Sequence, residues 1–291
     1  AHSAFNVLCT AMLLPAGGLL EKLAKRIVPD GKHADRFAEL DERLLATPSL
    51  ALERSRAVAA EMAERSVRAL KNALLCVTKY SSALAASVQQ DESDCDHYED
   101  ILGTYLVKLS ACKLSETESE EATELLKTIG DFERISDHAV NILESAEELR
   151  EKKLSFSASA QTEFDTLSAA INEILDLSLE AFTHDDVTVA AQVEPLEQVI
   201  DTLKEQLRTR HILRMQQGHC SIAAGFVWSD LLTNLERTSD HCSNIAGCVI
   251  DTAQHNLNLH ETLSAVKHGD GAFRHSFERY AEKYRLPYEV A

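Results

Sequence analysis

The chain contains few of the residues that interrupt helices or favour strands. Its 291 residues include ten glycines, five prolines and one tryptophan, and aromatic residues make up 5% of the total. Glycine and proline break helices, whereas aromatic residues are enriched in strands. Because hydrophobic residues still make up 45% of the chain, we expect an all-α protein that can bury a sizeable core.

Positive charge is also scarce. The chain has 29 lysines and arginines against 47 aspartates and glutamates, which leaves a formal net charge of −18. Such a surface repels the phosphates of nucleic acids and anionic lipids, and it attracts cations or basic partners. We therefore expect no nucleic-acid partner.

Standard catalytic and cysteine motifs are missing. The seven cysteines form no CxxC pair, which is typical of reduced thiols that act as small apolar side chains. The sequence contains no GxSxG, P-loop, GxGxxG or HExxH motif. Glu133 precedes His138 by five residues, and Glu236 precedes His241 by five, so neither pair has the Glu-x-x-His spacing of di-iron bundle proteins. No enzyme class is indicated.

The feature that the chain does have is a duplicated motif. Residues 131–141 read DFERISDHAVN, and residues 234–244 read NLERTSDHCSN, 103 positions later. The Glu, Arg, Ser, Asp, His and Asn of the two copies keep identical spacing. An internal repeat of this length indicates two similar structural units in tandem.

The acids of each copy are expected to share one face of a helix. Glu133 and Asp137 are four positions apart, so they lie on the same side of an α-helix, opposite an apolar stripe. A second acidic pair recurs 105 positions apart, and carboxylates on neighbouring helices hold hard or borderline cations such as Mg, Ca, Mn or Fe. The candidate metal ligands are Glu92, Asp96, Glu133, Asp137, Glu197, Asp201, Glu236 and Asp240. The candidate groups around these ligands are His138, Asn141, His241 and Asn244.

Two other interpretations of these acids remain open. Polar residues opposite an apolar stripe commonly face only water, although solvation alone does not fix residue identity in two copies. Arg134 and Arg237 stand beside the acids, and structural ion pairs would also explain the repeat.

The chain divides into five expected parts. Residues 4–20 are mostly apolar and are followed by Lys22, Lys25 and Arg26, which predicts the end of a membrane span; a buried N-terminal helix is the alternative. The expected parts are a span end at 1–26, a connector at 27–50, three-helix units at 51–152 and 153–255, and a helical tail at 256–291. Helices are expected at about 51–88, 91–114, 117–152, 159–184, through Pro195 to about 215, and from there to about 253.

The two motif copies closely resemble the paired signatures of PhoU-like domains, and Glu92-x-x-x-Asp96 and Glu197-x-x-x-Asp201 are similar to the other acidic motif of that family. The resemblance implies two three-helix bundles related by a pseudo-twofold axis, whose acids bind multinuclear metal clusters, divalent or of iron or zinc. In one departure from the motif, Asn234 replaces the acid found at Asp131, so we expect the two sites to differ in charge.

The N-terminal residues 1–15 also resemble the last membrane segment of bacterial sodium/phosphate cotransporters, whose members carry a PhoU-like domain at the C-terminus. This resemblance implies the regulatory region of a sodium-dependent phosphate symporter, in the inner membrane, with the residues after about 26 in the cytoplasm. The implied partners are the transporter's own membrane domain, Na⁺, inorganic phosphate and a second copy in a homodimer. The alternatives are a soluble PhoU-type regulator of phosphate uptake and signalling, and a purely structural dimerising bundle.

Overall fold

The computed structural model describes residues 40–254 and 271–287. The chain divides into two units, residues 1–41 and 42–291, and the description below concerns the second. Within the described residues the secondary structure is entirely helical. The elements are a short 3₁₀ helix η2 (Glu42–Ala46) and the helices α3 (Pro48–Thr78), α4 (Ser82–Ser110), α5 (Glu116–Glu151), α6 (Ala158–His184), α7 (Val187–Gln216), α8 (Ile222–Gln254) and α10 (Gly271–Lys283).

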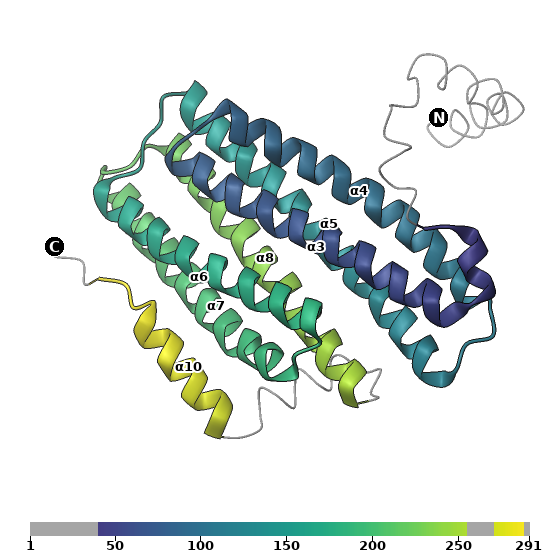
Figure 1. The fold of residues 1–291 in the computed structure, drawn as a ribbon. Helices are drawn as coiled ribbons and strands as arrows, with labels where there is room; N and C mark the ends of the chain where they lie inside the picture. Colours follow the sequence, from purple (N-terminus) through teal and green to yellow (C-terminus); the bar gives the residue numbers. More distant parts are fainter. Residues whose placement is uncertain (1–39, 255–270, 288–291) are drawn as a thin grey trace, which may run out of the picture. The chain divides into compact units, whose positions relative to one another are not determined.

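The helices form two bundles of three, which confirms the predicted fold class. Helices α3, α4 and α5 pack against one another, and so do α6, α7 and α8 (Figure 1). The two bundles meet where α5 packs against α8 and where α3 packs against α6. Each helix that carries a motif copy therefore lies at the junction between the halves.

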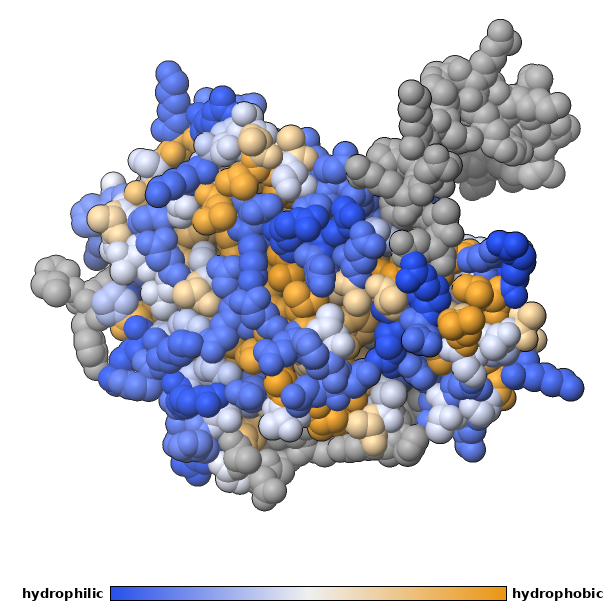
Figure 2. Space-filling model, viewed as in Figure 1, coloured by the Kyte–Doolittle hydropathy of each residue, from blue (hydrophilic) through white to orange (hydrophobic). Residues whose placement is uncertain are grey.

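The core is built from apolar stripes at helical spacing. In α5, Phe132, Ile135, Ala139 and Ile142 are all completely buried, as the sequence pattern predicts. Phe132 also contacts Phe182 of α6 edge-to-face, with ring centroids 5.0 Å apart, so this stripe joins the two bundles. The face drawn in Figure 2 is mostly hydrophilic, with apolar residues in separate areas, in keeping with the strong negative charge.

The start of α5 is stabilised by a capping box. The Ser115 side chain accepts a hydrogen bond from the backbone N–H of Glu118, and the Glu118 carboxylate accepts one from the backbone N–H of Ser115. This reciprocal pair satisfies two amide groups that the first turn of a helix leaves open.

Two predicted helix boundaries are wrong. The first helix ends at Thr78 rather than near Val88, and Val88 is a buried interior residue of α4. The turn between α3 and α4 spans only 79–81 and contains neither glycine nor proline, so composition does not mark it. The second helix accordingly begins at Ser82 rather than near 91. Pro195 lies inside α7, which begins at Val187 after the N-cap Asp186. The Asp186 carboxylate accepts bonds from the amides of Thr188 and Val189.

The tail helix α10 packs along α7 (Figure 1). Tyr280 and Tyr284 are buried, and the Tyr284 hydroxyl donates a hydrogen bond to Glu173 of α6. Lys283 forms an ion pair with the same carboxylate at 2.7 Å. The tail is therefore attached to both α6 and α7.

The predicted membrane span at 1–26 and most of the connector at 27–50 lie outside the described residues. Among the helices at 40–254 and 271–287, none is both long and apolar enough to cross a membrane.

We predict that Phe132→Ala destabilises the protein by about 3–5 kcal/mol, because it removes a fully buried ring at the junction of the bundles. Urea unfolding at neutral pH measures this change. Phe226→Ala is the matched control: Phe226 is 68% exposed, and its loss should change stability by no more than about 0.5 kcal/mol. Equal losses in the two variants would contradict the packing described here.

Candidate functional site

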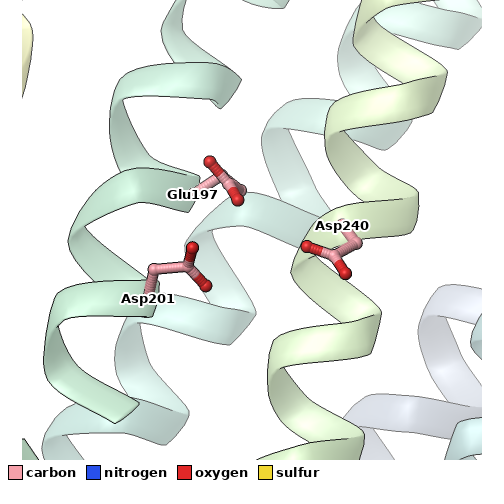
Figure 3. A group of neighbouring side chains, drawn as sticks. All are labelled: Glu197, Asp201 and Asp240. Atoms are coloured by element: carbon pink, nitrogen blue, oxygen red, sulfur yellow. The ribbon is translucent and has the colours of Figure 1, made fainter. Parts of the chain in front are cut away.

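Three of the predicted acids meet in the second repeat. Glu197 and Asp201 lie one turn apart on α7, and Asp240 faces them from α8 (Figure 3). One carboxylate oxygen from each side chain lies within 4.8 Å of the others. Glu197 is buried, Asp201 is exposed and Asp240 is half-buried, so the group opens to solvent on one side. Three hard oxygen donors in this arrangement suit a cation such as Mg²⁺, Ca²⁺ or Mn²⁺.

The negative charges of these acids repel one another. Burial, followed by the charges of Glu236 and Asp201, raises the pKa of Asp240 above its ordinary value. Glu236 is not part of the close set, because Lys204 of α7 forms an ion pair with it at 3.2 Å. The site therefore contains three close acids and a fourth that a lysine already neutralises.

The acids of the first repeat lie near one another but are less tightly gathered. Among the residues described at 40–254, no three of these acids have carboxylate oxygens within 4.8 Å of one another. The acids compared are Glu92, Asp96, Glu133 and Asp137. Burial, then the charges of Asp137 and Asp96, raises the pKa of Glu92. Burial, then the charge of Asp137, also raises the pKa of Glu133. These acids share one negative field, which a bound cation would relieve.

The two repeats differ at a position that sequence reasoning missed. Lys204 follows Asp201 by three residues, and the corresponding residue after Asp96 is Glu99. Glu99 adds to the negative charge that raises the pKa of Glu133, whereas Lys204 pairs with Glu236. Comparing the two repeats at their offset of 105 positions, one helical turn beyond Asp96 and Asp201, would have shown this difference. The first site is therefore the more acidic of the two.

The neighbouring arginines hold the acids only weakly. Arg134 lies 3.5 Å from Glu133 and 3.6 Å from Asp137, and Arg237 lies 3.9 Å from Asp240. Both arginine side chains are more than 60% exposed. Exposed pairs at such distances contribute little to stability, so structural ion pairing by these arginines does not account for the repeated acids.

The motif histidines connect the two repeats. Nδ1 of His138 lies 2.9 Å from Oδ1 of Asn234, and Nδ1 of His241 lies 2.8 Å from Oδ1 of Asp131. Asn244 donates a further hydrogen bond to Asp131 at 3.2 Å. The two imidazole rings are 5.6 Å apart. Each histidine thus contacts the opposite repeat, in a reciprocal pattern that corresponds to an approximate twofold axis between α5 and α8.

This pattern changes the interpretation of one prediction. The exchange of Asp131 for Asn234 was expected to alter the charge of a metal site, but both residues face the histidine of the opposite repeat. The charge difference between the sites comes instead from Glu99 and Lys204. Asn141 ends the first motif copy as Asn244 ends the second, and Asn141 is exposed.

Fold and site together define a class of protein, namely a duplicated helical bundle with an acidic motif pair in each half. The PhoU domain family model matches residues 59–146 and 164–249, one match in each bundle. The chain belongs to the PhoU domain family.

Curated relatives support this assignment. A Phosphate-specific transport system accessory protein PhoU homolog 1 from Thermotoga maritima is 29% identical over 145 residues, which are 50% of this chain and 61% of that protein. A Phosphate-specific transport system accessory protein PhoU homolog from Deinococcus radiodurans is 26% identical over 125 residues, or 42% of this chain and 56% of that protein. The matches thus span about three fifths of each relative's length.

Solved structures show the same fold. The crystal structure of PhoU from Pseudomonas aeruginosa matches 70% of this chain and 98% of its own, with a TM-score of 0.67 at 21% identity. The phosphate transport system regulatory protein PhoU from Streptococcus pneumoniae matches 73% of this chain and 99% of its own, with a TM-score of 0.64 at 17% identity. Both structures place the two bundles of this chain in the PhoU fold.

These findings correct the predicted location. The sequence suggested an inner-membrane protein, but the described helices contain no span, and the matched relatives are named accessory proteins of a transport system rather than transporters. The inner-membrane prediction is therefore wrong.

The contact between the repeats should respond to pH. Burial lowers the pKa of His138 below its ordinary value, an effect that the hydrogen bond to Asn234 opposes and that the charges of His241 and Arg237 reinforce. Below the ordinary pKa the unfolded chain then binds more protons at this position than the folded chain does, so stability falls as the pH falls.

We predict that lowering the pH from about 7.5 to about 5.5, across the ordinary histidine pKa, reduces the free energy of unfolding less in His138→Gln than in the unaltered protein. Urea unfolding at the two pH values measures this difference. All carboxyl groups are the same in the two proteins, so their contributions largely cancel in the comparison. His219→Gln, on the exposed turn before α8, is the control and should behave like the unaltered protein. An unchanged pH dependence in His138→Gln would contradict the burial of this imidazole.

Proposed function

We propose that this protein is a PhoU-type accessory protein that regulates phosphate uptake, and that cations bound by its repeated acids hold the regulatory state of the bundles. The observation that carries the metal part of this proposal is the convergence of Glu197, Asp201 and Asp240 from two helices (Figure 3). The phosphate part rests on membership of the PhoU family and on the names of the relatives. An accessory role needs no catalytic residues.

The regulator was the alternative to a symporter region in the sequence analysis. The relatives and solved structures named above are accessory and regulatory proteins, so they favour the regulator. The proposed partners are components of a phosphate transport system. Association into a homodimer and contact with inorganic phosphate or Na⁺ stay predictions.

The donor set fits a hard or borderline cation. The acids supply oxygen atoms only, and their pKa values are raised by burial and by one another, in Asp240 of the second repeat and in Glu92 and Glu133 of the first. A bound cation would offset both effects, because it supplies the opposite charge in a partly desolvated place. The first repeat, with Glu99 in place of a lysine, should bind the more highly charged ion or cluster.

Metal binding and structural pairing make opposite predictions for Asp240→Asn. In EDTA at pH 7, the substitution should raise the free energy of unfolding by about 0.5 kcal/mol, since it removes a like-charge contact with Glu236 one turn away. In Mn²⁺ the order should reverse, because saturating metal at 100 times Kd stabilises a binding-competent protein by about 2.7 kcal/mol. Thermal and urea unfolding with and without metal test both signs.

Asp165→Asn is the matched control for this experiment. Asp165 is an exposed acid on α6, away from both acidic groups, and its loss should leave the response to Mn²⁺ unchanged. If Asp240→Asn destabilises the protein in EDTA and leaves the Mn²⁺ response intact, the acids are structural partners and the metal proposal is wrong.

The regulatory role is tested in cells. Expression of the protein in a bacterial strain that lacks its own phosphate transport accessory protein should restore normal uptake of labelled phosphate. The double variant Asp137→Asn, Asp240→Asn should restore it several-fold less well, and Asp165→Asn should restore it fully. Uptake that does not respond to the protein at any external phosphate concentration would reject the regulatory proposal, whatever the metal measurements show.

A further inference from the structure

A second group of ligand-type side chains lies where α7 turns into α8, on residues that the acidic motifs do not include. Sγ of Cys220 is 3.8 Å from Nε2 of His211. Sδ of Met215 and the same Nε2 both border Gly225, where a Cβ would lie 2.7 Å from the sulfur and 3.1 Å from the nitrogen. A thiol and a thioether thus both lie near one imidazole nitrogen.

The imidazole of His211 is held rigidly. The side chain is 4% exposed, and its ring stacks on Trp228 with centroids 5.6 Å apart and an angle of 19° between the planes. Its second nitrogen, Nδ1, has no hydrogen-bond partner among the described residues. The polar contact that the ring does make is through Nε2 to Cys220, and this is the nitrogen that lies beside Met215.

The glycine at 225 keeps the group together. Its φ value is that of an ordinary helical residue, so backbone conformation does not require glycine here. A Cβ at this position would meet the end of Met215 and the ring of His211, so the flexible Met215 side chain would have to move away. The small residue therefore lets the sulfur and nitrogen atoms approach one another.

Charged side chains lie beside this group, and they affect which ion can bind there. Glu163, buried at 1% exposure, binds Arg214 at 2.7 Å and Arg210 at 3.1 Å, so two guanidinium groups share one carboxylate. Arg214 also lies over the ring of Trp228, 5.9 Å from its centroid, on the same ring that supports His211. A deprotonated Cys220 would supply one negative charge, which balances a monovalent ion.

The geometry points to a binding site for a soft monovalent cation, Cu(I), ligated by Nε2 of His211, Sδ of Met215 and Sγ of Cys220. Thiolate and thioether sulfur are the ligands that select Cu(I), and imidazole also suits copper. Cys220 is only half-buried, which provides a path for the ion to enter. The site is separate from the oxygen-rich acids, which suit hard cations, and it does not depend on the regulatory proposal.

The test is anaerobic titration of the whole protein with Cu(I) in competition with bathocuproine disulfonate. The unaltered protein should bind one Cu(I) per chain at this site. Cys220→Ser and Gly225→Ala should each weaken binding at least about tenfold, the first by removing a ligand and the second by displacing Met215 while all three ligands remain. X-ray absorption at the copper edge should show both sulfur and nitrogen neighbours.

Two matched controls accompany these variants. Cys112→Ser removes a half-buried thiol at the end of α4, and Gly130→Ala adds a methyl group to a helical glycine with nothing within 4 Å of the new carbon. Both should bind Cu(I) like the unaltered protein. Thermal unfolding without metal checks that each variant is folded, and Met215→Leu replaces any variant that is not.

Cu(I) binding that is equally strong in the unaltered protein, Cys220→Ser and Gly225→Ala would overturn the proposal. So would a loss of binding in Cys112→Ser as large as that in Cys220→Ser, because the other cysteines would then be the ligands. Failure to bind Cu(I) in competition with the chelator at any protein concentration would also reject the site.

Discussion

The packing of α5 against α8 determines where every other functional group lies. These two helices carry the duplicated motif, and each uses one face for the apolar core and another for contact with its counterpart. His138 and His241 each reach across to the residue that begins the other motif copy. The acids, displaced around each helix by the 100° step per residue, then face α4 in one bundle and α7 in the other. One helix pair thereby positions two sites.

The acids have an electrostatic cost that the rest of the structure only partly offsets. Burial and mutual repulsion raise the pKa of Glu92, Glu133 and Asp240, and the arginines beside them are exposed and distant. Lys204 neutralises one acid in the second repeat, whereas Glu99 adds another in the first. The two halves share a fold and a motif but present different fields. Both halves keep the fold and the motif, whereas one position on α4 and α7 differs in charge.

How much of this could be read from the sequence depends on the range of the interaction. Helical periodicity, the Ser115–Glu118 cap and the fold class depend on residues close in sequence, and they were predictable. The turn at 79–81 was not, since it contains neither glycine nor proline to mark the end of α3. The reciprocal histidine contacts depend on how two helices face each other, and a linear pattern does not contain that information. The group at His211, Met215 and Cys220 was missed for the same reason, because the turn at the end of α7 brings these residues together.

The second half also differs from the first in how firmly its end is tied. Arg210 donates hydrogen bonds both to Glu163 of α6 and to the backbone carbonyl of Pro287, beyond α10. Arg214 joins the same carboxylate and lies over Trp228, which in turn supports His211. A structural change at the turn between α7 and α8 would therefore affect α6, α7 and the tail, because the buried carboxylate of Glu163 links them. Removing one partner of a buried ion pair is strongly destabilising, so Arg210 and Arg214 fasten these elements to one another through Glu163.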